Sequence, residues 1–469
     1  MVENADLICN LVYDYYETRI LLGACRYGEN LPAIPRIGGN FQMAPRTVRA
    51  ALSRLEKNGY IEISPRKTAK VIYQASADQI KENAVLYFVP RCSGIIDFCQ
   101  AGKLLIEPVW EYAQKSYDKE TWDRLKENMA KLKNVDLSIS TRLHIQVFSD
   151  LGNKLILNFY WELLRYIRFP YLSNHRMHEE RDRELLADGK EKELEFMNAA
   201  FEGDFAACIS QLLAFCAEMD GEYGRKEKVP FYWNIYWQRP QLCYTMVSRI
   251  ITEIITGTYP VGGNLPSMPV MSQQLNVSYR TLRRTLSILD SLSIIRLHQG
   301  KVSEVCEDIE QIDFQRLEVK EGFRLYRESL QFMALTVRPV FLYTLEHVEK
   351  EELEKLRYGF KQLLNENQSE RCFKLALDFI IERCPSATVR ECYTRLSEFL
   401  VWGYPFALYR IRKQHLHEEY TKMVRISDEL LENEDWEGYA DSWKALMEYE
   451  QKRAEKILAD CQEQGRMGQ

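Results

Sequence analysis

One pattern occurs twice in this chain, 234 positions apart, and it constrains the fold more than any other feature. "NLPAIPRIGGNFQMAPRTVRAALSRLE" begins at Asn30, and "NLPSMPVMSQQLNVSYRTLRRTLSILD" begins at Asn264. Between Arg19 and Ile61, 14 of 43 positions are identical to those 234 residues later, without a gap. A fainter likeness, "FPYL" at 169 and "YPFA" at 404, lies near the end of each half. Internal duplication is the simplest explanation of such a repeat.

The repeat divides the 469 residues, too many for one ordinary core, into two halves. Each half begins with short segments broken by Gly and Pro and continues with apolar residues at helical spacing, as in "EELEKLRYGFKQLLN". The stretch "DGEYGRKEKVP" between them has the composition of a linker. We predict six parts: the first module (1–75), helical domain 1 (76–222), a linker (223–240), the second module (241–307), helical domain 2 (308–460) and a tail (461–469).

The two modules are basic islands in an acidic chain. Residues 10–75 carry a charge balance of +5 and residues 243–303 a balance of +4, whereas the whole chain has a net charge of −6. A basic face on a small module is the expected footprint of a polyanionic partner. Because ordinary solvated surfaces are also often basic, charge alone leaves both interpretations open.

Composition predicts a globular protein that stays in the cytosol and outside the membrane. Apolar residues make up 46% and charged residues 28% of the chain, and no run is apolar enough for a membrane span. The start, "MVENADLICNLVYDYY", is acidic where a secretory signal is basic. The 12 cysteines form no C-x-x-C pair, which favours reduced, buried thiols over a disulfide framework or a zinc site.

Each repeat contains an amphipathic helix with a basic outer face. Pro45 suits the first position of one helix, and Ser278 is a good N-cap for the other. Helical spacing places these residues inward: Val48, Leu52 and Leu55, and Leu282, Leu286 and Leu289. It places these residues outward: Arg46, Arg49, Ala50 and Ser53, and Arg280, Arg283, Arg284 and Ser287.

These arginines oppose the dipole of their own helix. The first turn is the positive end, where each exposed cation loses about 0.3–1 kcal/mol. A sequence selected only for stability would have Asp or Glu there. The N-terminal residues of a recognition helix reach base edges in the major groove, where Arg pairs with guanine or with phosphate. The pattern therefore favours contact with DNA over a solvated basic face.

A short apolar strand, a polar turn and a second strand follow each helix, in "GYIEISPRKTAKVIYQ" and "SIIRLHQGKVSEVCE". The first of these runs carries Arg66, Lys67 and Lys70, and the second carries Lys301. A two-stranded wing with a basic tip can lie along a phosphate backbone beside the groove.

The order helix, "LP", helix, "VS.RT.R..L..L" and wing resembles the winged helix-turn-helix of the GntR family of bacterial transcription regulators, in both modules. The family motifs are matched by Leu31-Pro32 with Thr47-Val48-Arg49, and by Leu265-Pro266 with Thr281-Leu282-Arg283. Ile34-Pro35 and Met268-Pro269 depart from the family's Glu-Arg contact pair. The resemblance implies double-stranded DNA as a partner. We predict these DNA-binding residues: Arg46, Thr47, Arg49, Ser53, Arg66, Lys67, Ser278, Tyr279, Arg280, Thr281, Arg283, Arg284 and Lys301.

The rest of each half resembles the helical effector domain of the FadR-type branch of that family, through "RLHIQVFSDLGNKLI" and "FEGDFAACISQLL". This implies a small organic acid or acyl effector. Many members bind a metal through Asp and three His, but only His144 remains here and Ser140 replaces the Asp. We therefore predict no metal and no other cofactor. His175 and His178 could chelate at their i, i+3 spacing, although a surface or partly buried pair is the commoner outcome.

No sequence motif indicates catalysis. The chain has no nucleophile elbow, P-loop, dinucleotide-binding glycine motif or metalloprotease motif, so we do not expect an enzyme. The aromatic cluster "FYWNIYWQRP" has two interpretations. It is a stacking platform for bases or a ligand, or it is an apolar strap that packs the second module against its neighbours, which we favour.

The sequence thus predicts a mainly α fold with two winged helix-turn-helix domains, each followed by an all-helical domain. The predicted function is a ligand-responsive, sequence-specific transcription regulator. One chain could act as a pseudo-dimer, and a homodimer stays open. Because Ala50 in one module corresponds to Arg284 in the other, we expect non-identical half-sites. The alternative is a helical sensor or scaffold whose modules have lost DNA contact, and Pro35 and Pro269 speak for it.

Overall fold

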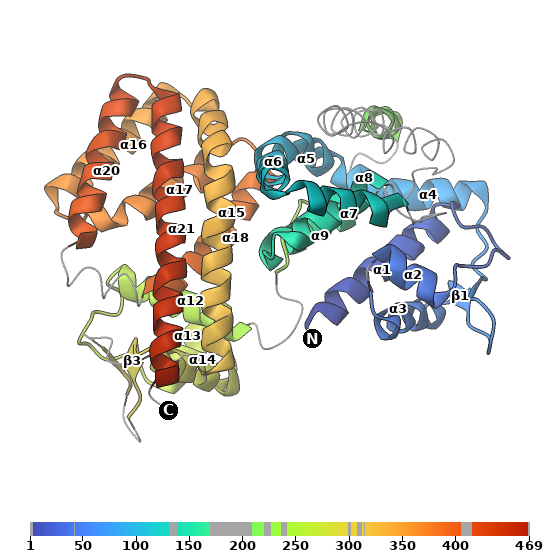
Figure 1. Cartoon of the computed structure of the whole chain (residues 1–469), viewed down its shortest axis with the longest axis horizontal. Coiled ribbons are helices and arrows are strands. Elements are labelled where there is room, and N and C mark those ends of the chain that lie inside the picture. Colours follow the sequence, from blue (N-terminus) through green and yellow to red (C-terminus); the bar gives the residue numbers. More distant parts are fainter. Residues whose placement is uncertain are drawn as a thin grey trace. The chain divides into compact units, whose positions relative to one another are not determined.

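A computed structural model shows two compact units, residues 1–102 with 110–237 and residues 103–109 with 238–469 (Figure 1). The structure describes residues 3–41, 43–130, 139–168, 209–219, 227–235, 242–298, 302–306, 312–313, 315–404 and 415–467. Over these residues the fold is mainly helical, as predicted, and its sheets are two short ribbons. None of the described helices is long and apolar enough to cross a membrane.

Three helices and a ribbon form the first module: α1 (Glu3–Leu21), α2 (Ile34–Phe41), α3 (Pro45–Lys57), β1 (Ile61–Glu62) and β2 (Lys70–Val71). α3 begins at Pro45, as predicted, and buries Val48 and Leu55 completely. Gly59 ends the helix with a φ of +77°, a conformation that glycine adopts without strain. The chain then turns directly into the ribbon.

The repeated "NLP" belongs to the wing. The backbone of Asn30 pairs with that of Lys70, and the Leu31 N–H donates to the Ala69 carbonyl at 2.8 Å. Leu31 is only 2% exposed. Pro32 has no N–H with which to continue the pairing, so the chain leaves the ribbon there.

The same elements recur 234 positions later, in α12 (Leu242–Ile255), α13 (Met268–Leu275), α14 (Tyr279–Ser291), β3 (Ile295–Arg296) and β4 (Glu304–Val305). Ile61 pairs with Val71, and Ile295 pairs with Val305 in the same register. The bridge of Asn30 to Lys70 also recurs, between Asn264 and Glu304. The positions that are alike in sequence therefore hold the same places in the backbone.

Pro35 and Pro269 each occupy the second residue of a helix, in α2 and α13. The first N–H groups of a helix have no acceptor within it, so proline is tolerated in the first turn. Both prolines, which depart from the family pattern, therefore stand where a helix tolerates them.

Helices also dominate the rest of the first half. They are α4 (Ala77–Phe88), η1 (Val89–Arg91), α5 (Cys92–Leu105), α6 (Glu107–Ser116), α7 (Lys119–Ala130), α8 (Ile139–Asp150), α9 (Lys154–Ile167) and a helical segment at 209–219. Part of the aromatic cluster lies along α9 as an extended strap. Phe231 and Trp233 are buried, and the Trp233 Nε1 donates to Asn158 Oδ1 at 2.7 Å. These residues therefore form an apolar strap on α9, whereas the prediction placed the strap against the second module.

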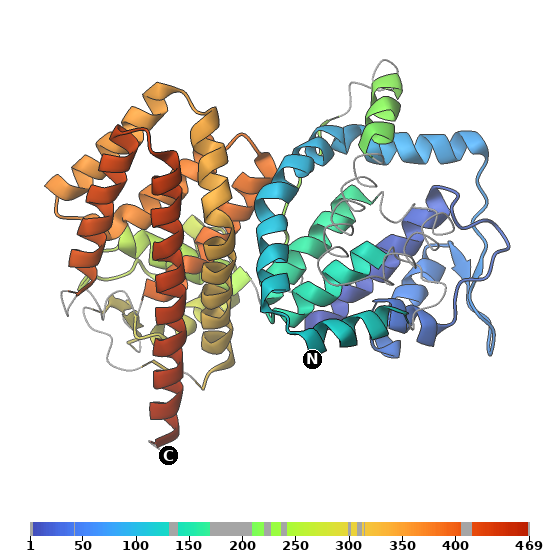
Figure 2. The same cartoon turned by 45° about the horizontal axis from the view of Figure 1, so that its top comes forward.

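The second half ends in a helical bundle: α15 (Leu317–His347), α16 (Lys350–Asn365), η4 (Ser369–Arg371), α17 (Cys372–Arg383), α18 (Ala387–Leu400), η5 (Val401–Gly403), α20 (His415–Glu432) and α21 (Trp436–Met467). The longest two, α15 and α21, lie side by side (Figure 2). Phe341 packs edge-on against Tyr439, with 5.1 Å between ring centroids, and Trp443 lies beside both. None of the nine cysteines whose side chains are described forms a disulfide, and burial raises the pKa of Cys392.

Candidate nucleic-acid interface

The outward face of α3 is a row of exposed side chains. Arg46, Arg49, Ala50 and Ser53 are all exposed, while Val48 and Leu52 on the opposite face are buried. Neither Arg46 nor Arg49 forms an ion pair with a described residue. These guanidinium groups are therefore available to an external anion. Thr47, which the motif also suggested, is only 9% exposed and offers little side-chain surface.

A third arginine of α3, Arg54, is held by α1. Its Nη1 donates to Asn10 Oδ1, and its guanidinium lies over the Tyr13 ring, 4.4 Å from the centroid. The Tyr13 hydroxyl also accepts from Asn58 Nδ2 at 2.6 Å. These contacts attach the C-terminal end of α3 to α1 and so help to fix the orientation of its exposed face.

The wing is tied to the helix by an acidic residue that sequence reasoning missed. The Ile63 N–H donates to Glu56 Oε1 at 2.8 Å, and the Leu297 N–H donates to Asp290 Oδ1 at 3.0 Å in the second module. The signal was present, because an acidic residue stands at the same place in two otherwise basic helices. At the wing tip, Arg66 and Lys67 are exposed.

The N-terminal end of α14 presents a similar face. Tyr279 is 53% exposed, and Arg280 and Arg283 are exposed. The Ser278 side chain accepts from the Thr281 N–H at 3.2 Å, which is the predicted N-cap. The predicted wing residue Lys301 lies outside the described residues, as do His175 and His178.

In the C-terminal half of the α14 face, Arg284 and Ser287 contact α15, and Arg284 keeps 42% of its side chain exposed. Arg284 Nη2 lies 3.1 Å from Glu318 Oε1 of α15. Arg316 Nη1 lies 2.8 Å from three acceptors: the Ser287 carbonyl, Ser287 Oγ and Ser291 Oγ. Arg284 and Ser287 were predicted to face outward; Arg284 is exposed and Ser287 is half-buried, and both also contact the start of α15.

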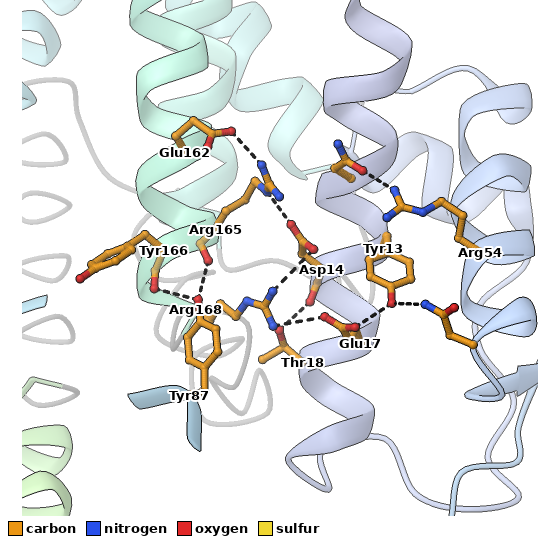
Figure 3. A network of polar contacts seen from close by, with 12 residues as sticks. Tyr13, Asp14, Glu17, Thr18, Arg54, Tyr87, Glu162, Arg165, Tyr166 and Arg168 are labelled. Carbon is orange, nitrogen blue, oxygen red and sulfur yellow. Dashed lines mark hydrogen bonds and ion pairs between the residues drawn. The ribbon is translucent and has the colours of Figure 1, made fainter. Parts of the chain in front are cut away.

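A polar cluster joins α1 of the first module to α9 of helical domain 1 (Figure 3). Asp14 forms ion pairs with Arg165 and, at 3.6 Å, with Arg168, which also pairs with Glu17 at 3.3 Å. Burial opposes the charge on Arg165, but Asp14 and the neighbouring Glu162 outweigh it and raise its pKa. The cluster lies among residues 151 positions apart in the chain.

In the second half, the equivalent position on the first helix meets an aromatic ring. Ser248 stands 234 positions after Asp14, and its Oγ accepts from Trp402 Nε1 at 3.2 Å. Trp402 is fully buried, and Gly322 of α15 lies so close that a Cβ there would meet its Cε3 at 1.9 Å. One unit thus uses ion pairs where the other uses close packing.

His144 lies in an aromatic stack. Its ring centroid is 4.2 Å from that of Trp110 and 5.8 Å from that of Tyr160, both nearly parallel to it. It is 6% exposed. The residue at the corresponding position of the second half, Phe379, is also 6% exposed and apolar, which fits a packing role. The described residues contain no group of three or more His, Cys, Asp or Glu side chains placed to hold a metal ion.

Comparison with known proteins identifies the first module. Residues 10–71 match the family model described as "Bacterial regulatory proteins, gntR family". This part of the chain is a GntR-family helix-turn-helix domain, which implies DNA as its partner. A comparison with curated proteins found no match.

Several solved structures are similar to part of this chain. "Streptococcus agalactiae GntR" is 14% identical, with 46% of this chain and 99% of that chain covered and a TM-score of 0.20. "E. coli McbR/YncC" is 14% identical, with 46% and 98% covered and a TM-score of 0.27. A GntR family member from Pseudomonas syringae pv. tomato is 14% identical, with 49% and 91% covered and a TM-score of 0.23.

Proposed function

We propose that this chain regulates transcription by reading DNA with two winged helix-turn-helix modules. The observation that carries the proposal is the face of α3, where Arg46, Arg49 and Ser53 are exposed on a GntR-family domain and neither arginine has a described ionic partner. The N-terminal turns of this helix enter the major groove, and Arg66 and Lys67 of the wing contact the backbone beside it.

We include the second module in this proposal because its backbone has the same arrangement of helices and strands as that of the first. Its ribbon has the same register, and its helix carries Arg280 and Arg283 where the first has Arg46 and Arg49. Since Arg284 replaces Ala50, the two modules read different half-sites. A single chain then serves as a pseudo-dimer on an asymmetric operator.

Effector control is the second part of the proposal. The ion pairs of Asp14 with Arg165 and Arg168 provide a physical connection by which helical domain 1 can orient α1. The family resemblance suggests a small organic acid or acyl compound as the effector. A thermal-shift screen of carboxylic acids against the full chain tests this, and a ligand that also alters DNA affinity supports it.

DNA binding is tested by measuring the affinity of the full chain for random duplex DNA at several salt concentrations. Several phosphate contacts give a steep negative slope of log affinity against log salt. Arg49→Ala should weaken binding strongly, whereas Lys115→Ala on α6 should leave it unchanged. A flat salt dependence with no effect of Arg49→Ala would contradict the proposal and favour a helical scaffold.

A further inference from the structure

The start of α15 contacts the C-terminal half of the outward face of α14. Arg284, Ser287 and Ser291 succeed one another along that face, and all three are held by Arg316 or Glu318. We call these five residues the clasp. Arg316 also lies 3.4 Å from Glu318, so the two anchoring side chains support each other. Burial opposes the charge of Glu318, but its hydrogen bonds and the two arginines outweigh this and lower its pKa, so the carboxylate stays ionised.

The first module has no such cover among its described residues. Ala50 stands in place of Arg284, and Ser53 and Lys57 are exposed where Ser287 and Ser291 are half-buried. The chain that follows the first wing takes another path, because Asn83 Nδ2 of α4 donates to the Leu21 carbonyl of α1 at 2.9 Å. The difference therefore lies in the connection between wing and helical domain.

The contacted residues belong to the face that would enter DNA, next to the exposed Arg280 and Arg283. The opposite face carries Leu282 and Leu289, which are completely buried, so Arg280, Arg284 and Ser287 point away from the module. A helix with its side chains is about 10–12 Å across, and the major groove is about 12 Å wide. The groove has no room for α14 together with a second chain segment on its outward face.

We propose that the clasp is an autoinhibitory contact that closes the second module to DNA, so that only the first module reads DNA until the clasp opens. This inference rests on the proposed function, since it assumes that both modules are DNA readers. Opening requires that Arg316 leaves Ser287 and Ser291 and that Glu318 releases Arg284. The second module then adds Arg280, Arg283 and Arg284 to the interface.

The decisive variant is Arg316→Met in the full chain. Removal of a positive charge alone weakens DNA binding, whereas opening of the clasp strengthens it, so the two effects have opposite signs. We expect roughly tenfold tighter binding to a duplex selected with the parent protein, and a salt slope steeper by about 0.9 for each added phosphate contact. A hydroxyl-radical footprint should extend beyond the site of the first module. Adding Arg283→Ala should reverse all three gains.

Glu318→Gln provides a second route, with Glu321→Gln as its matched control. Both remove one negative charge from α15, but Glu321 pairs with Arg324. We expect Glu318→Gln alone to extend the footprint. If circular dichroism shows that Arg316→Met does not fold, the comparison of Glu318→Gln with Glu321→Gln decides between the outcomes. Equal effects of the two glutamines, or an Arg316→Met variant that folds and binds no more tightly than the parent, overturn the proposal. Arg49→Ala in the parent separates this failure from that of the proposed function, because it tests the first module alone.

Discussion

The Nε of Arg165 donates to the carboxylate of Asp14, and this ion pair connects the last turn of α9 to the first helix of the DNA-reading module. The Asp14 side chain is 8% exposed and that of Arg165 is 19% exposed. Arg168 approaches the same carboxylate, and Glu162 accepts from Arg165 at 2.9 Å. The junction therefore consists of several charges that depend on one another in a largely dry environment.

Removal of Asp14 should destabilise the first unit. In Asp14→Ala, two half-buried guanidinium groups lose a common partner; loss of one partner of a fully buried pair costs about 3–5 kcal/mol, and we expect a loss toward the lower end of this range. Urea denaturation followed by circular dichroism measures this. The control is Glu111→Ala, because Glu111 pairs with Lys115 in an exposed position. It should unfold at the same urea concentration as the parent. Equal small effects of the two variants would contradict the role of the junction.

The same junction should make stability depend on pH. Burial raises the pKa of Glu162 from an ordinary value of 4.5 to about 7, against the opposing effect of Arg165. Between these values the folded state binds more protons than the unfolded state. The contribution of Glu162 is therefore complete below pH 4.5 and is lost as the pH rises to 7, by up to about 1.4 kcal/mol per pH unit.

Glu162→Gln tests this sign, because the amide stays neutral at every pH. The free energy of unfolding of the variant minus that of the parent should increase from pH 5 to pH 7 and stay constant above it. Urea denaturation at intervals of half a pH unit measures the difference. A difference that is constant from pH 5 to pH 8 would show that this carboxyl titrates normally.

A substitution of Gly322 in α15 tests the close packing around Trp402, which takes the place of this junction in the second unit. Ala is about 1 kcal/mol more favourable than Gly inside a helix. In Gly322→Ala the new methyl group would collide with the Trp402 ring, and overpacking of this kind costs about 1–3 kcal/mol or more. Gly39→Ala in α2 is the control, because nothing lies within 4 Å of its Cβ. Thermal unfolding should show a loss for Gly322→Ala and no loss for Gly39→Ala, and equal shifts would contradict the close packing.

Much of both modules could be predicted from the sequence because the signals are local. Apolar residues at helical spacing decided the inward faces of α3 and α14, and Val48 and Leu282 are buried accordingly. Ser278 could be predicted as an N-cap because capping depends only on an extended backbone and on a hydroxyl that accepts from a nearby N–H. The prediction was least informative at Thr47, which lies at the border between the two faces.

The clasp and the two junctions could not be predicted in this way. Arg316 reaches Ser287 across 29 positions, and Asp14 reaches Arg165 across 151, so neither contact leaves a periodic trace. The halves also differ at these points, since Ser248 replaces Asp14 and Arg284 replaces Ala50. An alignment of the two halves shows where the chain has diverged but not what each new side chain contacts. Those contacts become visible only in the folded structure, where the path of the chain after each wing can be followed.

The N-caps of α3 and α14 allow a prediction in which one module serves as the reference for the other. Ala44 has a φ of −64° and a ψ of 142°, and Ser278 has −66° and 151°, so both backbones suit a capping residue. Only Ser278 has a side-chain oxygen that accepts a hydrogen bond from an N–H group in the first turn of its helix. Ala44→Ser should therefore stabilise the first module by about 0.5–2 kcal/mol, and Ser278→Ala should destabilise the second by a similar amount.

Urea denaturation of both N-cap variants measures these changes, and Ala50→Ser is the matched control. It introduces the same hydroxyl into the same helix, but at an exposed interior position where each backbone N–H already has its acceptor. Serine is a weaker helix former than alanine, so the control should lose a few tenths of a kcal/mol. If Ala44→Ser behaves like Ala50→Ser, the N–H groups at the start of α3 are already satisfied and the comparison of the two caps fails. Opposite signs at Ala44 and Ala50 would establish that α3 lacks a cap that α14 has.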